Sequence, residues 1–199
     1  MTIDLVESIA MGDMKVGLST DRRRLLQAQR RRVELRLTPE SPPAYGINTG
    51  FGALAEMRVS AENLNRLQTN LIRSHCTGVG EPFSIPITRA IMLLRAQVLA
   101  KTTSGARPII VDLLIDMLNL GIHPLIPSKG SVGASGDLAP LAHLALALIG
   151  EGDVRTKSGV ETAAHALSTA NLTPLSLEAK EGLALINGTQ AMTADLALT

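Results

Sequence analysis

A glycine-rich loop at residues 130–137 contains the residues of this sequence with the most distinctive chemistry. Within it stands the tripeptide Ala134-Ser135-Gly136. If the backbone nitrogen of Gly136 attacks the carbonyl carbon of Ala134 and two waters leave, the Ser135 side chain becomes a methylidene on a five-membered imidazolone. Glycine suits the attacking position because it lacks a Cβ and lets the loop bend tightly. The product is a strong electrophile, although ordinary residue frequencies predict an Ala-Ser-Gly in about one chain in ten of this length.

Other catalytic and phosphate-binding motifs do not fit this loop. A serine nucleophile elbow needs Gly-x-Ser-x-Gly, and Asp137 stands at its last position. The loop also lacks the Lys-Ser/Thr ending of a P-loop and the Gly-x-Gly-x-x-Gly spacing of a dinucleotide site. Only the general affinity of a helix N-terminus for anions remains, so phosphate binding is a minor alternative.

The elements around this loop are expected to bring it into the interior. Residues 138–149 are apolar on nearly every side, which predicts a buried helix with Asp137 as its N-cap. A second glycine-rich loop, residues 45–52, has three glycines in eight residues and begins with Tyr45. A predicted helix starting near Ser60 places His75 on its apolar stripe, where it is either functional or a satisfied core histidine.

The rest of the chain reads as ordinary helices and one hairpin. A helix from residues 19–21 to about Leu37 should turn Leu25, Leu26, Val33 and Leu35 inward, and prolines stop it. Further helices are expected from the apolar spacing around Ile91 and from Pro108 to Gly121, and a surface hairpin around residues 157–159. The predicted fold class is mainly α: a helical N-terminal domain with long Gly-rich active-site loops and a small hairpin.

Composition predicts a mostly helical domain and excludes several other classes. The chain of 199 residues is 45% hydrophobic but only 2% aromatic, and its net charge is +1. Seven arginines within residues 21–36 form the one basic patch, which without interleaved aromatics is expected to be a solvated helix face rather than a nucleic-acid site. No stretch approaches the roughly 20 apolar residues of a membrane span, and no signal peptide is recognised.

The cysteine and histidine inventory indicates a reducing compartment and no metal. Cys76 is the single cysteine and so cannot form an internal disulfide. The four histidines are scattered, and His123 and His165 have no partner pattern typical of a metal site. His143, inside the predicted buried helix, is assigned to packing or to support of the site. A cytoplasmic location is expected.

Four long segments follow one another in an order that resembles a known family. They read Tyr45-Gly-Ile-Asn-Thr-Gly-Phe-Gly52, Arg73-Ser-His-Cys-Thr-Gly-Val-Gly-Glu-Pro82, Gly130-Ser-Val-Gly-Ala-Ser-Gly-Asp-Leu-Ala-Pro-Leu-Ala-His143 and Glu181-Gly-Leu-Ala-Leu-Ile-Asn-Gly-Thr-Gln190. All four are similar to motifs of the aromatic amino acid ammonia-lyases, most closely those specific for histidine. Residues 1–40 and 151–173 are less distinctive.

The resemblance implies roles for the candidate residues. Ala134, Ser135 and Gly136 would cyclise autocatalytically into a methylidene-imidazolone prosthetic group, with no external cofactor. Tyr45 would be the base that removes the β-proton of the substrate; since a free tyrosine titrates at about 10, the site must lower its pKa. Asn187 would hydrogen-bond the electrophile and the substrate amine, although Asn187-Gly188 alone indicates only a turn.

His75 is the residue that the resemblance connects with substrate choice. The pair Ser74-His75 is the form seen in the histidine-specific lyases, whereas phenylalanine-specific relatives have apolar pairs and tyrosine-specific lyases tend to have His-Leu. The implied reaction is elimination of ammonia from L-histidine to give urocanate, the first step of histidine degradation. Whether the electrophile adds to the amine or to the imidazole ring stays open. The helix beginning near Asp137 is expected to point its positive end at the ring.

The chain end and the resemblance together predict an incomplete polypeptide. Residues 196–199 lie inside an apolar helical pattern without a cap or stop. We therefore expect residues 1–199 to be the N-terminal portion of a homotetrameric carbon-nitrogen lyase, inactive alone, with the C-terminal helical-bundle region absent. Two alternatives remain: a tyrosine 2,3-aminomutase or other aromatic amino acid lyase, which uses the same electrophile, and a catalytically incompetent folding or interaction module.

Overall fold

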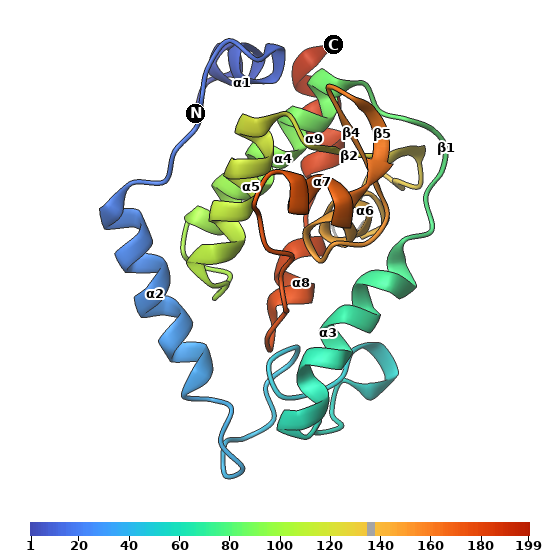
Figure 1. Cartoon of the computed structure of the whole chain (residues 1–199). Coiled ribbons are helices and arrows are strands. Elements are labelled where there is room, and N and C mark those ends of the chain that lie inside the picture. The colour runs from blue at the N-terminus through green and yellow to red at the C-terminus, as the bar shows by residue number, and fades with distance from the viewer. Residues whose placement is uncertain (135–137) are drawn as a thin grey trace.

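The computed structural model of the chain describes residues 1–134 and 138–199 (Figure 1). Over these residues the chain forms helices joined by loops and a few short strands, which confirms the predicted mainly α class. The helices are α1 (Ile3–Met11), α2 (Thr20–Glu34), the short 3-10 helix η1 (Gly52–Leu54), α3 (Ala61–His75), α4 (Ile85–Ala100), α5 (Pro108–Leu120), α6 (Ala139–Leu148), α7 (Ala163–Thr169), α8 (Glu181–Ile186) and α9 (Gln190–Leu198). The strands are β1 (Val79–Pro82), β2 (His123–Pro124), β3 (Pro127–Lys129), β4 (Asp153–Thr156) and β5 (Gly159–Thr162).

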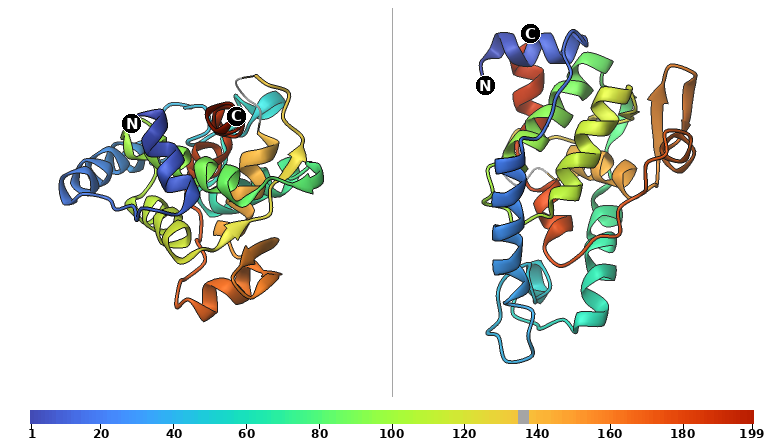
Figure 2. Two further views of the ribbon diagram at one scale, coloured as in Figure 1. Left: turned by 90° about the horizontal axis from the view of Figure 1, so that it is seen from above. Right: turned by 60° about the vertical axis from the view of Figure 1, so that its left-hand side comes forward.

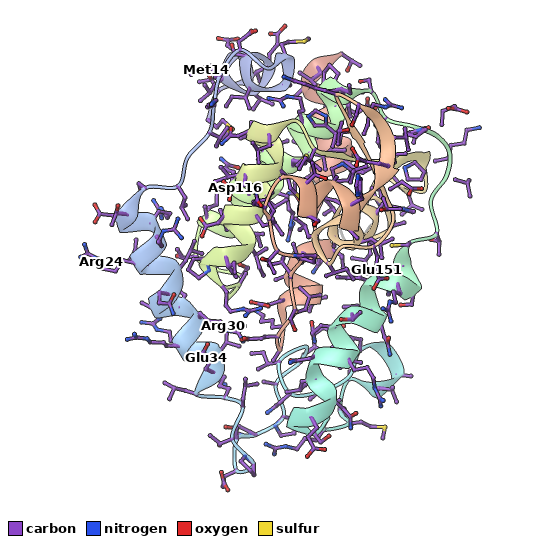
Figure 3. All side chains as sticks on the ribbon, in the orientation of Figure 1. Met14, Arg24, Arg30, Glu34, Asp116 and Glu151 are labelled. Atoms are coloured by element: carbon purple, nitrogen blue, oxygen red, sulfur yellow. The ribbon has the colours of Figure 1, made fainter. Side chains whose placement is uncertain are left out.

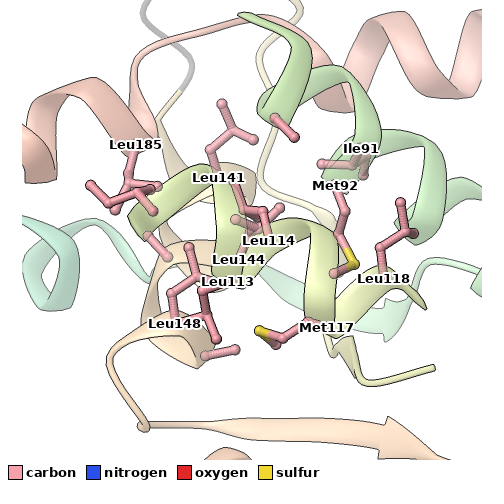
Figure 4. Packing of buried hydrophobic residues seen from close by; sticks show 14 of the residues in the cluster. Ile91, Met92, Leu113, Leu114, Met117, Leu118, Leu141, Leu144, Leu148 and Leu185 are labelled. Carbon is pink, nitrogen blue, oxygen red and sulfur yellow. The ribbon is translucent and has the colours of Figure 1, made fainter. Parts of the chain in front are cut away.

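The core lies where α4, α5, α6 and α8 meet. Side chains from these helices interdigitate around Leu114 and Leu141, which are almost completely buried (Figure 4). The predicted all-apolar helix is α6, and seven of its ten residues are buried, so this expectation is confirmed. Such burial fixes the helix that follows residues 130–137, the predicted electrophile loop, because interior packing tolerates little displacement.

The peripheral elements surround this core. Helices α2 and α3 run along opposite sides of the molecule (Figure 1). Strands β1 and β3 form one antiparallel pair, and β2, β4 and β5 form a three-stranded sheet. The β4–β5 hairpin, predicted around residues 157–159, projects to one side together with α7 (Figure 2). None of the helices in the described part of the chain combines the length and apolar character needed to cross a membrane.

Helix α2 corrects part of the sequence prediction. It begins as expected, with the Ser19 side chain accepting a hydrogen bond from the Arg22 amide, but it ends at Glu34 rather than near Leu37. Leu35 is 75% exposed because it lies beyond the helix end, and Leu25 is 48% exposed because it flanks the buried stripe. The expectation that these two leucines face inward is wrong.

The buried stripe of α2 contains an arginine, although its basic residues were expected to be solvated. Arg30 is 1% exposed and lies between Leu26 and Val33 on the side of α2 that faces the core (Figure 3). Its guanidinium pairs with Glu34 at 3.1 Å and with Glu178 at 2.8 Å. Burial of this cation is possible because carboxylates compensate its charge.

The same ionic cluster holds the beginning of α8. Glu181, the first residue of α8, is fully buried and accepts hydrogen bonds from Nε and Nη2 of Arg107 at 2.8 and 2.7 Å. Its Oε1 also accepts from the Arg107 backbone amide at 3.1 Å. Glu178 bridges Arg107 and Arg30. The cluster therefore ties α8 to α2 and to the start of α5.

Replacing Glu181 with glutamine is expected to destabilise the protein by on the order of 3 kcal/mol, because the buried Arg30 and the half-buried Arg107 lose a carboxylate. The measurement is the urea concentration at the unfolding midpoint. The matched control is Glu62→Gln, since Glu62 is exposed in the first turn of α3. Equal midpoints for the two variants would show that the cluster does not stabilise the fold.

A second buried arginine, Arg89 of α4, joins α1 to the core. Its guanidinium donates to the Ile9, Ala10 and Leu118 carbonyl groups. It also lies 3.2 Å from Nε2 of His123, which must accept this hydrogen bond because arginine has only donors. His123 is therefore held as a neutral ring.

Because His123 is neutral in the folded protein, we expect the free energy of unfolding to decrease in acid. Burial, with smaller contributions from Arg89 and Arg155, lowers the pKa of His123 from 6.5 to about 4. Between these two pKa values the unfolded chain binds a proton that the folded chain does not. The stabilisation by the neutral His123 ring is therefore complete above pH 6.5 and is lost as the pH falls toward 4. It amounts to at most about 3 kcal/mol.

We expect His123→Asn to flatten the decrease of unfolding free energy between about pH 7 and about pH 4.5, as measured by urea unfolding at both values. The control is His165→Asn, because the His165 side chain is 72% exposed. If the unfolding free energy of both variants decreases between the two pH values by as much as that of the unsubstituted protein, His123 does not titrate as proposed.

Candidate active site

The loop with Tyr45 is held rigidly by its own polar residues. Asn48 is buried, accepts a hydrogen bond from the Ala44 amide at 2.7 Å and donates to two carbonyl groups. Gly46 has a φ of +68°, and a Cβ at this position would lie 2.7 Å from Cδ2 of Leu183 in α8. The positive φ favours glycine at this position, and a Cβ would in addition force the Leu183 side chain to move.

The Tyr45 side chain projects outward from this rigid loop. It is 57% exposed, and its ring meets Phe51 edge to face with a centroid distance of 5.9 Å. A tyrosine that served only to fill the core would be buried. The arrangement instead fixes the ring by one aromatic contact and leaves much of the side chain accessible.

His75 is the last residue of α3 and is half-buried. Its Nδ1 lies 2.8 Å from the Leu71 carbonyl oxygen and 3.0 Å from Oγ of Ser74. Because a carbonyl oxygen only accepts, Nδ1 must donate, and in the neutral ring Nε2 is then an acceptor. The structure thus places His75 at a helix end, as predicted from the apolar spacing of this helix. It also determines that Nε2 is the nitrogen that can accept a hydrogen bond.

Two contacts join the segment after His75 to α6 and to the predicted electrophile loop. Nε2 of His143, in α6, accepts a hydrogen bond from the Gly78 amide at 3.1 Å. Burial lowers the pKa of His143, which keeps the ring neutral and able to accept. A Cβ on Gly130 would lie 3.0 Å from the Gly78 Cα, so the two backbones are in close contact.

The electrophile loop itself is described in part. Ala134 is exposed, and Gly133 before it has a φ of +67°. A Cβ on Gly133 would lie 3.9 Å from Sδ of Met192 in α9. Ser135, Gly136 and Asp137 lie outside the described residues. The N-cap of α6 is Leu138, one residue later than the predicted Asp137. Helix α6 begins at Ala139, so its N-terminal end follows the tripeptide within three residues.

Asn187 stands at the C-terminal end of α8 and is exposed. Its carbonyl oxygen accepts a hydrogen bond at 3.1 Å from Nη1 of Arg95 in α4. Helix α8 is also held from α3, because Oε1 of Gln68 accepts from the Gly182 and Leu183 amides. A helix of six residues would be marginal alone, so these contacts fix the position of Asn187.

The segments with the four candidate functions therefore meet around α8 and α9. The Tyr45 loop packs against α8 at Gly46, Gly133 lies near Met192 of α9, and Gly130 packs against Gly78 in the segment between α3 and β1. The polar residues that hold α8, Arg95 among them, were missed from the sequence. Arg95 follows Ile91 by four residues, so its place on the apolar stripe of α4 was an available signal.

Comparisons with known proteins agree on one family. The family model described as aromatic amino acid lyase matches residues 1–199. The histidine ammonia-lyase of Geobacillus thermodenitrificans is 59% identical over 150 residues, which are 75% of this chain and 30% of that protein.

Solved structures share the fold over the whole chain. The histidine ammonia-lyase of Trypanosoma cruzi matches with a TM-score of 0.90 and 36% identity, covering 99% of this chain and 38% of that one. The tyrosine aminomutase of Streptomyces globisporus matches with a TM-score of 0.91 and 40% identity, covering 99% and 37%. The chain spans about 30–38% of the length of these proteins.

Proposed function

The chain belongs to the aromatic amino acid lyase family, and from this premise we propose that it is part of a carbon-nitrogen lyase that eliminates ammonia from L-histidine and releases urocanate. The observation that supports histidine as substrate is the hydrogen-bond pattern of His75. Its Nδ1 donates to Leu71, so Nε2 is left to accept from a donor such as a substrate imidazole N–H. A substrate without that donor would leave a polar group unpaired, which costs affinity.

The described flanks of the loop fit a methylidene-imidazolone formed from Ala134, Ser135 and Gly136. Gly133 has a positive φ that bends the backbone just before the tripeptide, and Gly130 packs against Gly78. The start of the loop is therefore held in one position and leads into a tight turn. When formed, the group supplies an electrophile that either improves the amine as a leaving group or acidifies the β-hydrogen. No external cofactor or metal is part of this proposal.

The side chains around the loop have distinct tasks in the proposed reaction. Tyr45 removes the β-proton, for which its accessible ring on a rigid loop is suited. Asn187 presents its exposed carboxamide to the electrophile and to the substrate amine. The N-terminal end of α6 follows the tripeptide directly and stabilises negative charge that develops there.

The complete protein is proposed to be longer than the present chain. Since the chain matches only 30–38% of the lengths of its relatives, we propose that residues 1–199 are the N-terminal portion and inactive alone. The complete enzyme would be a homotetramer in the cytoplasm, with the absent C-terminal region supplying the remaining helices. Its partner is an amino acid substrate rather than nucleic acid or a membrane.

A second candidate is supported by the aminomutase structure. The tyrosine aminomutase of Streptomyces globisporus is 40% identical over 99% of this chain. The pair Ser74-His75 is compatible with that activity as well, so the site residues described above would serve an amino-group migration instead of a net elimination.

The test is a comparison of amino acids with the complete enzyme. It is incubated separately with L-histidine, L-tyrosine and L-phenylalanine, and products are identified by mass and absorbance. We expect urocanate and ammonia in equal amounts from histidine and little turnover of the others. Formation of β-tyrosine from tyrosine, with histidine untouched, would overturn the proposal in favour of the aminomutase.

A further inference from the structure

Arg95 of α4 is a buried arginine that contacts the turn between α8 and α9. Its side chain is 2% exposed. Nη1 donates to the Asn187 carbonyl oxygen at 3.1 Å and to Oε1 of Gln190 at 2.7 Å, and Nη2 donates to the Ala184 carbonyl oxygen. One planar group thus holds the last turn of α8, the connecting turn and the first residue of α9.

In the described part of the chain, no carboxylate pairs with the charge of Arg95. Its recorded hydrogen bonds all end on neutral oxygens, and within the described residues its Nε is buried without a partner. This differs from Arg30 and Arg107, which pair with Glu178 and Glu181. The desolvation cost of burying a cation is only partly offset by neutral hydrogen-bond partners, and an unpaired donor adds to that cost, so this arrangement contributes little to the stability of the fold.

Gly188 is independent evidence that the Arg95 contact constrains the turn. A Cβ at this position would overlap both the Arg95 Nη1 atom and the Gln190 Oε1 atom. Glycine directly after Asn187 therefore leaves the space in which the guanidinium and the carboxamide meet. The Asn187-Gly188 pair, which from the sequence indicates only a turn, contains this second requirement.

We propose that Arg95 is a positioning residue, which orients the Asn187 side chain toward the electrophile and the substrate amine by fixing the α8–α9 turn. The inference rests on the proposed function, in which Asn187 makes those two contacts. Of Asn187, Arg95 contacts only the backbone carbonyl group. Any effect of Arg95 on the reaction is therefore transmitted through the position of Asn187. The planar fork is needed because a single ammonium cannot bind three acceptors in one plane.

The test is a double-mutant cycle in the complete enzyme, read as kcat and KM for the amino acid that the unsubstituted enzyme converts. We expect Arg95→Lys to lower kcat/KM by about ten-fold to a hundred-fold, because a catalytic group is misplaced. In an Asn187→Ala background the same substitution should change kcat/KM by less than about two-fold, because the residue through which Arg95 acts is gone. Equal losses in both backgrounds, or no loss from Arg95→Lys alone, would overturn the proposal.

Arg89→Lys is the matched control, since Arg89 is a buried arginine of the same helix that also binds backbone carbonyl groups. Arg89→Lys should lower the unfolding midpoint. It should change kcat/KM by the same factor in the unsubstituted enzyme and in the Asn187→Ala background. If Arg95→Lys does not fold, Gly188→Ala tests the same contact and should show the same dependence on Asn187.

Peptide mass separates this proposal from the proposed function. Arg95→Lys and Asn187→Ala should both retain the loss of two waters from the tripeptide. Loss of the mass shift in Arg95→Lys but not in Asn187→Ala would overturn the positioning role. An unsubstituted enzyme that does not convert histidine would instead contradict the proposed substrate, and the cycle is then run with the amino acid that it does convert.

Discussion

Replacing Ser135 with alanine is expected to lower kcat/KM of the complete enzyme for histidine by at least about a thousand-fold. The hydroxyl group of Ser135 must leave as water for the methylidene to form, and alanine has none to lose. Because the remaining substrate contacts are unchanged, the loss should be mainly in kcat. The measurement is urocanate formation with enzyme corrected for the folded fraction.

Ser128→Ala is the matched control for this substitution. Ser128 is exposed in β3, in the strand that leads into the same loop but outside the tripeptide. Its replacement should leave kcat/KM within about two-fold of the unsubstituted enzyme, as is usual for an exposed site. Substantial turnover by Ser135→Ala would contradict the origin of the electrophile.

The second large effect is expected from Tyr45→Phe, which should lower kcat by about a hundred-fold to ten-thousand-fold. Phenylalanine keeps the edge-to-face contact with Phe51, so only the hydroxyl group is lost. The tripeptide should still lose two waters, which distinguishes a missing base from a missing electrophile. The measurements are steady-state kcat and the mass of the loop peptide.

Phe51→Leu is the control for Tyr45→Phe. It removes the aromatic contact and keeps the hydroxyl group, so we expect a decrease in kcat of less than about ten-fold. If the two variants lose activity equally, Tyr45 contributes through its packing and is not the base.

Local sequence signals predicted the helices with clear starts and the buried helix α6. Ser19 before α2, Pro108 and Gly121 around α5, and the apolar run of α6 each have a local physical cause that a single sequence displays. Leu25 and Leu35 show the limit of this reasoning. An apolar side chain beside the buried stripe of a helix, or beyond the helix end, is buried only if another element covers it, and no element of the described part of the chain covers these two.

The polar residues that hold α8 depend on contacts between distant segments. Arg30 and Glu178 are 148 residues apart, and Arg95 and Asn187 are 92 apart. Neither the charge pattern of α2 nor the composition of α4 indicates which oxygens these arginines meet. Tyr45, His75 and Asn187 were proposed from motif resemblance, and their roles stay predictions.

The structure shows how a six-residue helix can hold a candidate functional side chain in place. Helix α8 is held at its start by the Glu181 cluster, in its middle by Gln68 and at its end by Arg95. These polar contacts come from α2, α3, α4 and the N-cap residue of α5, so the position of Asn187 depends on most of the fold. Substitutions at these contacts should therefore affect activity as well as stability.

The proposed reaction depends above all on an electrophile formed from Ala134, Ser135 and Gly136. The most direct test is the mass of the peptide containing residues 130–143 from the unsubstituted complete enzyme. We predict a peptide lighter than its sequence by two water molecules, with the loss located to the tripeptide by fragmentation. A peptide with the full mass of its sequence, from enzyme that is active on histidine, would contradict the account.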